Sequence, residues 1–549
     1  MFVNHNNHLK SYNLFKDTTP RKLYTDFEYP LKDAVFFGSF LLIGVVLMYF
    51  GYFTPYSEIG FVVYCTVLVC VGILYCVYFG LIAPPHISIY NWLLMFFFFP
   101  KKELKPDMPS LLNIGFGFET VSISMYTILD VFLIGAIVIA VLVRRKSFVC
   151  QKISPNVRRL VFFSYMMILI GLIHILIIPA DTDIVATQQD YINIIATQQY
   201  GIVFLSLFPL IAAVILFKGA MYFINTREAV ERIFFYALAS SFLLVIEFIL
   251  SRYTAILPQE VVYYSLNYRG AFRSVLHSGD LLVSLILILG SASCLYFLLS
   301  RRKVMYGVLY IFFILLILLT YNRGSALAAM AMSAIVLMVH YRLTIKKTLL
   351  AFAIILSITS FLIDYNSLLS SLLEKIDFLD AVIYYAENQE SGILSLGSMS
   401  YRVEAQIRAI DVFLNYPIFG VGPGLAQDFM SSNSVASFLG EEGLTVGHNP
   451  HNLYISVLAE YGLFGIGFVL SLGIVIVCFY RSITKGTRRS TDRNQGSYRL
   501  NRLLSYAAIV GYLIYYWFQA LPLIYGLIFI LLRLTLLDDR FAVKPIKAT

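Results

Sequence analysis

Charged residues are scarce in this chain of 549 residues. Asp, Glu, Lys and Arg together make up only 13% of it, the hydrophobic types make up 59%, and the mean hydropathy is +0.78. Soluble globular domains carry about 25% charged residues. The composition therefore excludes a soluble globular protein and predicts an integral membrane protein.

Cysteine is also rare, and its positions suit neither disulfides nor a metal site. All six cysteines lie in predicted spans or cytoplasmic loops, so we expect no disulfides, and none has a zinc-type spacing. His448 and His451 could bind zinc, but no third ligand stands at a convincing distance along the chain. We therefore expect no metal and no cofactor.

The sequence predicts neither a cleavable leader peptide nor a nucleic-acid-binding surface. The first 33 residues are polar and mixed in charge, so we expect the first apolar helix to stay as an anchor. The net charge is +9, but the basic residues lie between apolar runs and indicate basic loops at a membrane rather than a nucleic-acid surface.

Long apolar runs are what the chain has in quantity, and they predict an all-α, polytopic fold with about 14 transmembrane helices. The predicted spans are 34–53, 59–83, 87–100, 121–143, 160–180, 201–223, 233–251, 278–300, 304–320, 325–341, 348–363, 453–480, 503–520 and 522–537. The domains that follow are a tail of 1–33, a bundle of 34–363, an outer loop of 364–452, a second group of spans in 453–537 and a tail of 538–549.

The basic residues indicate the orientation of these spans. If both termini are cytoplasmic, 29 of the 41 Lys and Arg residues fall in inner segments, as the positive-inside rule requires. Residues 364–452 then lie outside. This segment has a net charge of −8 and is too long for a passive connector, so we predict a folded outer helical subdomain.

Arginines on the outer face need an explanation, because short outer loops are normally poor in them. They are Arg269 and Arg273 before the eighth span, Arg323 in the turn after the ninth, and Arg402 and Arg408 in the long loop. Arginine grips pyrophosphate with paired N–H groups, so the set suits a pyrophosphate ligand. Contact with lipid phosphates is the alternative for each arginine alone.

A predicted helix over 400–415 separates the last two arginines. Its predicted buried stripe consists of Val403, Ile407, Ile410 and Leu414. Arg408 has Glu404 and Asp411 at helical spacing, which an ordinary surface ion pair explains. Arg402 has no acidic residue three or four positions away, so it is the better candidate to meet an anionic ligand.

The segment 447–467 is the most informative stretch. Asn449 and Pro450 predict a helix start, which would place His451 in the first turn, where the positive end of the helix dipole favours a neutral imidazole able to accept a proton. A surface histidine that only helps to cap the helix is the alternative. The glycines Gly462, Gly465 and Gly467 are expected to let a neighbouring helix approach closely.

The motif His451-Asn452, nine residues, Gly462, two residues, Gly465 resembles the O-antigen polymerase and O-antigen ligase superfamily, the Wzy/WaaL-type membrane glycosyltransferases. The segment 415–424, rich in Gly and Pro, resembles the family's approach to this histidine. Arg323-Gly324 and Arg269-Gly270 resemble its arginine-glycine turns. The resemblance covers about 265–470.

The resemblance implies a metal-independent enzyme of the bacterial inner membrane that polymerises glycan repeat units carried on undecaprenyl pyrophosphate. His451 and Arg402 would be catalytic, and Arg269, Arg273 and Arg323 would bind pyrophosphate. Secondary candidates are His448, Asn452 and Arg408. Expected partners are the lipid-linked glycan and membrane lipids, and a chain-length regulator and a flippase stay open.

Three other functions stay open at this point. A ligase would transfer the glycan to lipid A–core. A transporter would use the ionisable residues within the spans, which are Asp130, His174, Lys218, Glu247 and Glu460. A structural subunit of a polysaccharide export complex is the third alternative.

Overall fold

The computed structural model divides the chain into a unit of Met1–Thr54 and a unit of Pro55–Thr549. All residues that it describes belong to the second unit. They are Thr66 and residues 70–82, 86–98, 113–116, 119–122, 125–144, 153–177, 189–224, 227–253, 280–320, 322–341, 343, 398–426, 429, 452–486, 495–517 and 524–537. The predicted spans 34–53 and 348–363 lie outside them.

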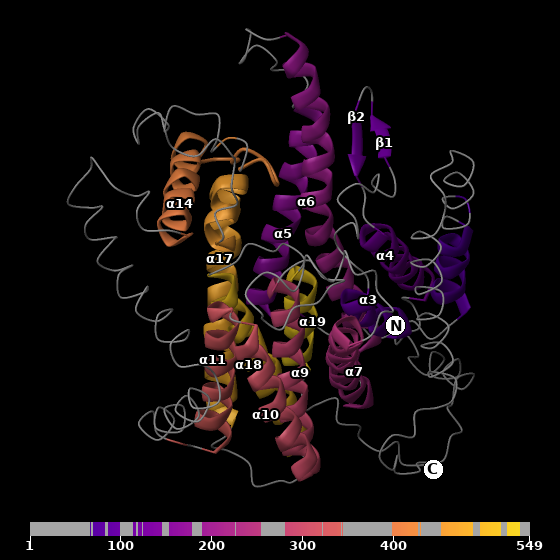
Figure 1. Cartoon of the computed structure of the whole chain (residues 1–549), viewed down its shortest axis with the longest axis vertical. Coiled ribbons are helices and arrows are strands. Elements are labelled where there is room, and N and C mark those ends of the chain that lie inside the picture. The colour runs from indigo at the N-terminus through magenta and orange to yellow at the C-terminus, as the bar shows by residue number, and fades with distance from the viewer. Residues whose placement is uncertain are drawn as a thin grey trace, which may run out of the picture. The chain divides into compact units, whose positions relative to one another are not determined.

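The described residues are mostly helical, as the apolar runs predict (Figure 1). A π-helix, η3 (Tyr78–Ile82), precedes the α-helices. The helices are α3 (His86–Phe98), α4 (Met125–Arg144), α5 (Pro155–Ile177), α6 (Gln189–Phe223), α7 (Arg227–Tyr253), α9 (Asp280–Arg301), α10 (Val304–Leu319), α11 (Arg323–His340), α14 (Ser398–Asn415), α17 (Leu453–Gly486), α18 (Gln495–Tyr516) and α19 (Ile524–Leu536).

One element departs from the all-α prediction. Strands β1 (Asn113–Phe116) and β2 (Glu119–Ser122) form an antiparallel hairpin in which Asn113 faces Ser122. At the other end of the pairing, Phe116 faces Glu119. Long apolar runs indicate only long membrane-spanning segments, so they cannot reveal a pair of four-residue strands.

Five of the described helices are long and apolar enough to cross a membrane. The segments are Pro155–Leu176, Ser206–Phe223, Glu228–Ile246, Val283–Arg301 and Leu453–Thr484. Large apolar side chains also cover outer surfaces of the helices: Leu176 is 78% exposed and Val304 80%. Exposed apolar surface of this kind is stable only against lipid. The chain is a polytopic membrane protein, and the predicted number of 14 spans stays a prediction.

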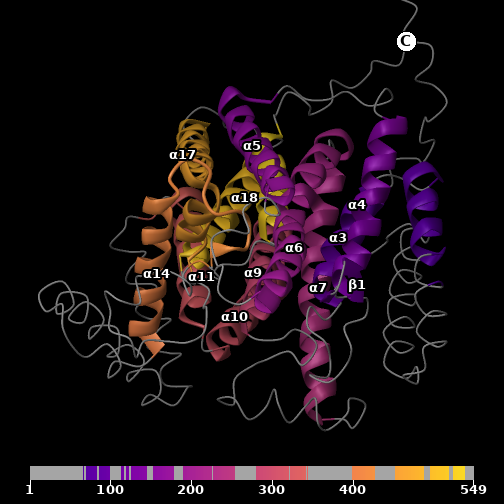
Figure 2. The ribbon, with the colours of Figure 1, turned by 90° about the horizontal axis from the view of Figure 1, so that it is seen from above.

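Helix α18 contacts helices that are distant in sequence as well as its sequence neighbours. It packs against α9, α11, α17 and α19 (Figure 2). Close approach to α11 depends on Gly511, because a Cβ there would lie 3.1 Å from the backbone oxygen of Ala328. Helix α5 packs along α17, and α19 packs along α6.

Ionisable residues within the spans have local structural partners. Asp130 accepts a hydrogen bond from the Trp92 indole at 2.7 Å, and the His174 ring bonds to the carbonyl of Ile170 at 2.9 Å. Lys218 is exposed, with its ammonium 5.1 Å from the centre of the Tyr165 ring. These contacts account for the three residues by local pairing, without a transport path. The side chain of Glu247 lies outside the described residues.

Arg533 is a buried cation that joins two helices. Its side chain on α19 is 0% exposed and donates to the carbonyls of Ala220 and Ile224, at 3.2 and 2.9 Å. These carbonyls belong to the C-terminal end of α6, where the helix dipole favours a positive charge. The contact therefore fixes α19 on α6.

We expect Arg533→Met to lower the free energy of unfolding by about 2–4 kcal/mol, because it removes a charged donor from buried carbonyls. The thermal midpoint of the purified protein in detergent measures the loss. Arg301→Met is the control, because the Arg301–Glu231 ion pair is 3.9 Å long and accessible to solvent, and such pairs contribute about 0–1 kcal/mol. Equal midpoints for the two variants would contradict the role given to Arg533.

Candidate functional site

Helix α17 begins three residues later than the predicted cap at Asn449 implies. Its N-cap is Asn452, whose side-chain oxygen accepts from the backbone amides of Tyr454 at 3.0 Å and Ile455 at 3.3 Å. The prediction that Asn449 caps the helix and that His451 lies in its first turn is therefore wrong. Asn452 is the cap because its side-chain oxygen accepts hydrogen bonds from two amides of the first turn. His451 directly precedes the cap in the sequence.

The same helix is interrupted ten residues further on. Gly462 has φ 58° and ψ −132°, a backbone conformation that divides α17 into Leu453–Tyr461 and a longer second segment. The amide of Leu463, which in an unbroken helix would donate to Ala459, donates to the carbonyls of Pro417 at 2.8 Å and Ile418 at 3.2 Å. A distant loop thus takes over the hydrogen bond that the break releases.

The other side of the break is satisfied by the same loop, which comprises residues 416–424 and is here called the clamp loop. The carbonyl of Ala459 accepts from the Val421 amide, and the carbonyl of Glu460 accepts from the Gly422 amide, each at 3.0 Å. The Glu460 carboxyl group accepts from the Gly424 amide. Glu460 therefore fastens the clamp loop, a role that the sequence did not reveal.

The glycines of the clamp loop allow the loop to lie close to the backbone of α17. Gly420, Gly422 and Gly424 all have positive φ, at 70°, 103° and 76°. A Cβ on Gly420 would lie 2.3 Å from the backbone of Glu460, so the loop can approach the helix only with glycine there.

The glycines of α17 have three different roles. Only Gly467 meets the prediction of a neighbouring helix, since a Cβ there would lie 2.1 Å from the Phe163 ring of α5. Gly465 approaches the carbonyl of Val457 in its own helix, at 2.3 Å for an added Cβ, and Gly462 forms the break. The prediction of helix–helix packing is wrong for these two, because a broken helix places its own segments in contact.

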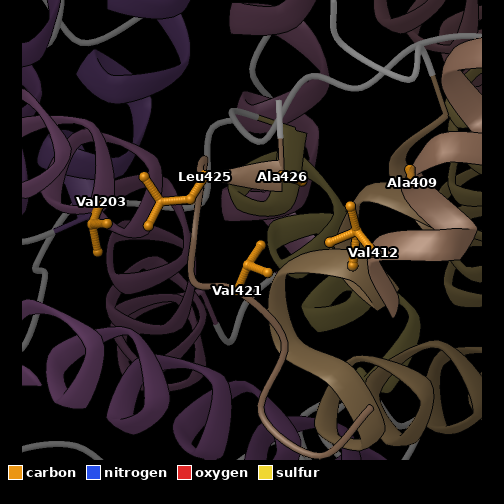
Figure 3. Packing of buried hydrophobic residues seen from close by; sticks show 7 residues of the cluster. Val203, Ala409, Val412, Val421, Leu425 and Ala426 are labelled. Atoms are coloured by element: carbon orange, nitrogen blue, oxygen red, sulfur yellow. The ribbon is translucent and has the colours of Figure 1, made fainter. Parts of the chain in front are cut away.

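Apolar side chains hold α14 and the clamp loop against α17 (Figure 3). The cluster consists of Val203, Ala409, Val412, Val421, Leu425, Ala426 and Ala459. Helix α5 supports the loop from another side, where Gly171 approaches Pro423 and His174 approaches Gly422. The loop is therefore held by α5, α6, α14 and α17 together.

The buried face of α14 is not the predicted stripe. Ile410 is 45% exposed and Leu414 66%, whereas Ala405, Ala409 and Val412 are buried. Small side chains face α17 because they allow closer packing than Ile and Leu would. Arg408 shares this buried face, at 7% exposure, so the prediction that it lies on the surface is wrong.

The N-terminal ends of three helices meet the C-terminal end of α18. The Tyr454 hydroxyl donates to the carbonyl of Leu513 at 2.8 Å, and the Tyr512 hydroxyl donates to that of Leu285 at 3.1 Å. Gly511 contacts Ala328 in α11. The starts of α9, α11 and α17 therefore lie at one end of the bundle, although they are far apart in the sequence.

Hydrogen bonds tie the starts of α9 and α11 together. The Ser284 hydroxyl donates to the Thr320 hydroxyl at 3.4 Å, and Thr320 lies 3.5 Å from the Ser325 hydroxyl. Asn322 caps α11 by accepting from the Ser325 amide at 3.2 Å. Arg323 is consequently the first residue of α11.

The candidate residues relate to this end of the bundle in different ways. Arg323 begins α11 and Arg402 is the fifth residue of α14, but their side chains are outside the described residues. Arg269, Arg273, His448 and His451 lie wholly outside them. Along the chain, Arg273 is seven residues before α9 and His451 two before α17. Within the described part of the chain, no three His, Cys, Asp or Glu residues form a metal-binding group.

These features define a polytopic membrane protein in which the starts of α9, α11 and α17 converge. Residues 307–470 match the family model described as O-antigen ligase, Wzy_C, so the chain carries a domain of that family, which includes polymerases as well as ligases. No curated protein matches the chain. The predicted resemblance is confirmed over residues 307–470, a segment that contains most of α10, all of α11 and α14, the clamp loop and the break in α17.

We expect Gly462→Ala to lower the free energy of unfolding by about 2–4 kcal/mol, because alanine is strained at this φ and its Cβ would lie 2.5 Å from the Pro417 carbonyl oxygen. The matched control is Gly473→Ala in the same helix, where a Cβ meets nothing within 4 Å and alanine should be neutral or slightly stabilising. Thermal midpoints in detergent compare them. If both variants melt like the wild type, the break does not depend on glycine.

Proposed function

We propose that the protein polymerises oligosaccharide repeat units carried on undecaprenyl pyrophosphate at the outer face of the membrane. The observation that carries the proposal is the convergence of the starts of α9, α11 and α17 at the end of α18. Two of these helices lie in the segment that matches the O-antigen ligase family. The family implies a lipid-linked glycan as substrate.

The arginine candidates would act on the pyrophosphate of the donor. Arg323 begins α11, and Arg269 and Arg273 precede α9 by eleven and seven residues. Paired guanidinium N–H groups match phosphate oxygens and stabilise the charge that develops on the leaving group. Arg402 would assist as a further cation. Pyrophosphate then departs without a nucleotide or a metal.

His451 would act as the general base. It stands two residues before the first helical residue of α17, where the positive end of the helix favours the neutral ring. A neutral imidazole can accept the proton of the acceptor sugar hydroxyl as the hydroxyl oxygen attacks the anomeric carbon of the donor. His448 is the secondary candidate for this role.

A ligase is the second candidate function, because the matching family model is described as O-antigen ligase. The donor and the chemistry would be the same, and the acceptor would be lipid A–core. The two functions differ only in the acceptor, so the products in cells separate them.

We expect His451→Ala to abolish the function, since no base then accepts the hydroxyl proton; removal of a general base typically costs about 10²–10⁴-fold in rate. The measurement is the surface-glycan profile of cells that carry a deletion, the wild-type gene or His451→Ala. A polymerase predicts one repeat unit on its acceptor in both defective strains. A ligase predicts no attached units and an accumulation of lipid-linked polymer. Full restoration by His451→Ala would contradict the assignment of the base.

We expect Arg323→Ala to raise the KM for the lipid-linked donor and to lower kcat, by about 10²-fold or more in kcat/KM. Arg323→Lys should recover only part of the loss, because an ammonium group cannot form the paired bonds of a guanidinium group. The assay is turnover of a purified lipid-linked repeat unit by the protein in detergent. Wild-type kinetics for Arg323→Ala would remove this residue from the pyrophosphate site.

A further inference from the structure

Helix α14 has two apolar faces that point in opposite directions. The face of Ala405, Ala409 and Val412 is buried, and α14 packs against α17 at the edge of the described helices (Figure 2). Ile410 and Leu414, which the sequence predicts to be buried, lie about half a turn away and are exposed. An apolar stripe of this kind is stable only where something other than water covers it. The two side chains therefore need a partner.

The exposed apolar surface continues from α14 into the clamp loop. Ile418 and Phe419 are each 54% exposed. The Leu463 amide donates to the Ile418 carbonyl at 3.2 Å, and the Phe419 ring lies nearly parallel to the Phe464 ring, with 6.1 Å between their centres. These contacts place this part of the loop beside the surface of α17 just after the break.

The adjoining surface of α17 is one side of a membrane-spanning segment. Leu463, Leu470, Ile474 and Val477 are all exposed. They recur at intervals of seven, four and three residues, so they line one face of the helix. They belong to Leu453–Thr484, which is long and apolar enough to cross a membrane. The exposed surface of α14 and the clamp loop thus continues the lipid-facing side of α17.

Two arginines mark one end of the membrane helices α5 and α17. Arg159 near the start of α5 and Arg481 near the end of α17 are both exposed. The Asn156 side-chain amide donates to the Cys478 sulfur at 3.0 Å, so these two ends lie together. Because charged side chains avoid hydrocarbon, the arginines indicate one boundary of the apolar layer.

The distance from this boundary gives the depth of the clamp loop. Leu463 precedes Arg481 by 18 residues, which is about 27 Å of helix. His174, which approaches the clamp loop at Gly422, follows Arg159 by 15 residues, or about 22 Å. The hydrocarbon core of a bilayer is about 30 Å thick. Both helices therefore place the clamp loop just inside the opposite boundary of the hydrocarbon.

We propose that Ile410, Leu414, Ile418 and Phe419 form a lipid-docking surface, which inserts among the acyl chains of the leaflet at the start of α17. In the predicted orientation this is the outer leaflet. Acyl chains fit because the surface is uncharged, adjoins the lipid-facing side of α17 and lies at the edge of the hydrocarbon. Interfacial helices bury their apolar face about 5–10 Å into this zone, which suits the stripe of α14.

This surface gives the clamp loop a second support. The apolar cluster with α6, α14 and α17 holds the loop on one side, and lipid would hold it on the side where Ile418 and Phe419 are exposed. The surface contains no residue of the proposed reaction. Loss of lipid contact and loss of glycan transfer are therefore separate findings.

Tryptophan placed on the lipid-docking surface reports what covers it. We expect Ile410→Trp, Leu414→Trp and Phe419→Trp to keep thermal midpoints near that of the wild type, because each side chain is exposed. The full-length variants are reconstituted in phosphatidylcholine vesicles, either with bromine on the acyl chains or with iodide on both sides of the membrane. The wild-type protein, with Trp92 and Trp517, gives the baseline emission.

Brominated lipid should quench the added tryptophan more strongly than iodide does in all three variants, because bromine on an acyl chain acts only within the hydrocarbon. Asn415→Trp is the matched control. Asn415 follows Leu414 on α14, and its side chain donates to the Asp411 carboxylate at an exposed position, 3.2 Å away. The emission of this control should be lost mainly to iodide. Three probe positions keep the test valid if one variant fails to fold.

Three results would overturn the inference. Stronger quenching by iodide at the three positions would show that the surface lies in water. Protection from both quenchers would show that a second copy of the protein or another segment of the chain covers it. Equal quenching by brominated lipid in the Asn415→Trp control would show that the apolar stripe does not select the side of α14 that meets lipid.

Discussion

Backbone hydrogen bonding at the break in α17 is the constraint on which this part of the structure depends. Within a membrane, an N–H or C=O group that a helix releases must find another partner in the protein. The amide of Leu463 and the carbonyls of Ala459 and Glu460 find theirs in the clamp loop. The break can therefore exist only while the loop is in place. The short first segment of α17 is consequently positioned by the protein around it rather than by the rest of its own helix.

The packing around the clamp loop holds the loop in the position that the break in α17 requires. Val421 and Leu425 anchor the loop in an apolar cluster with α14 and α6, while Pro423 lies against Gly171 of α5. The small residues of α14 face α17, so the two helices pack closely. The segment 398–426 is thus tied to the membrane helices along its described length. Its separate status as a subdomain stays a prediction, as does the orientation of the termini.

The long helices could be predicted from the sequence, because a run of apolar residues is a local signal: α9, α10 and α11 begin and end within two residues of the predicted spans. The site could be predicted only in part. Gly462 and Gly420 are visible as glycines, but Gly420 approaches the backbone of Glu460 and Gly462 that of Pro417, and contacts over 40 or more positions have no local signature. The buried face of α14 was missed because size, not hydrophobicity alone, decides which residues face a close neighbour. The cap at Asn452 was missed because Asn449 and Pro450 carry an equally good local signal.

The break leaves a short helical segment at the start of α17 that the surrounding protein can hold at both ends. Leu453–Tyr461 is held at one end by Asn452 and at the other by the clamp loop, and Tyr454 bonds it to the end of α18. A segment fixed at both ends keeps its first residue in register with the starts of α9 and α11. The proposed transfer between two glycans would need such register, because a base and a pyrophosphate site must meet one anomeric carbon at the same time. In that proposal the glycine motif is a positioning device, and the chemistry resides in the residues that it aligns.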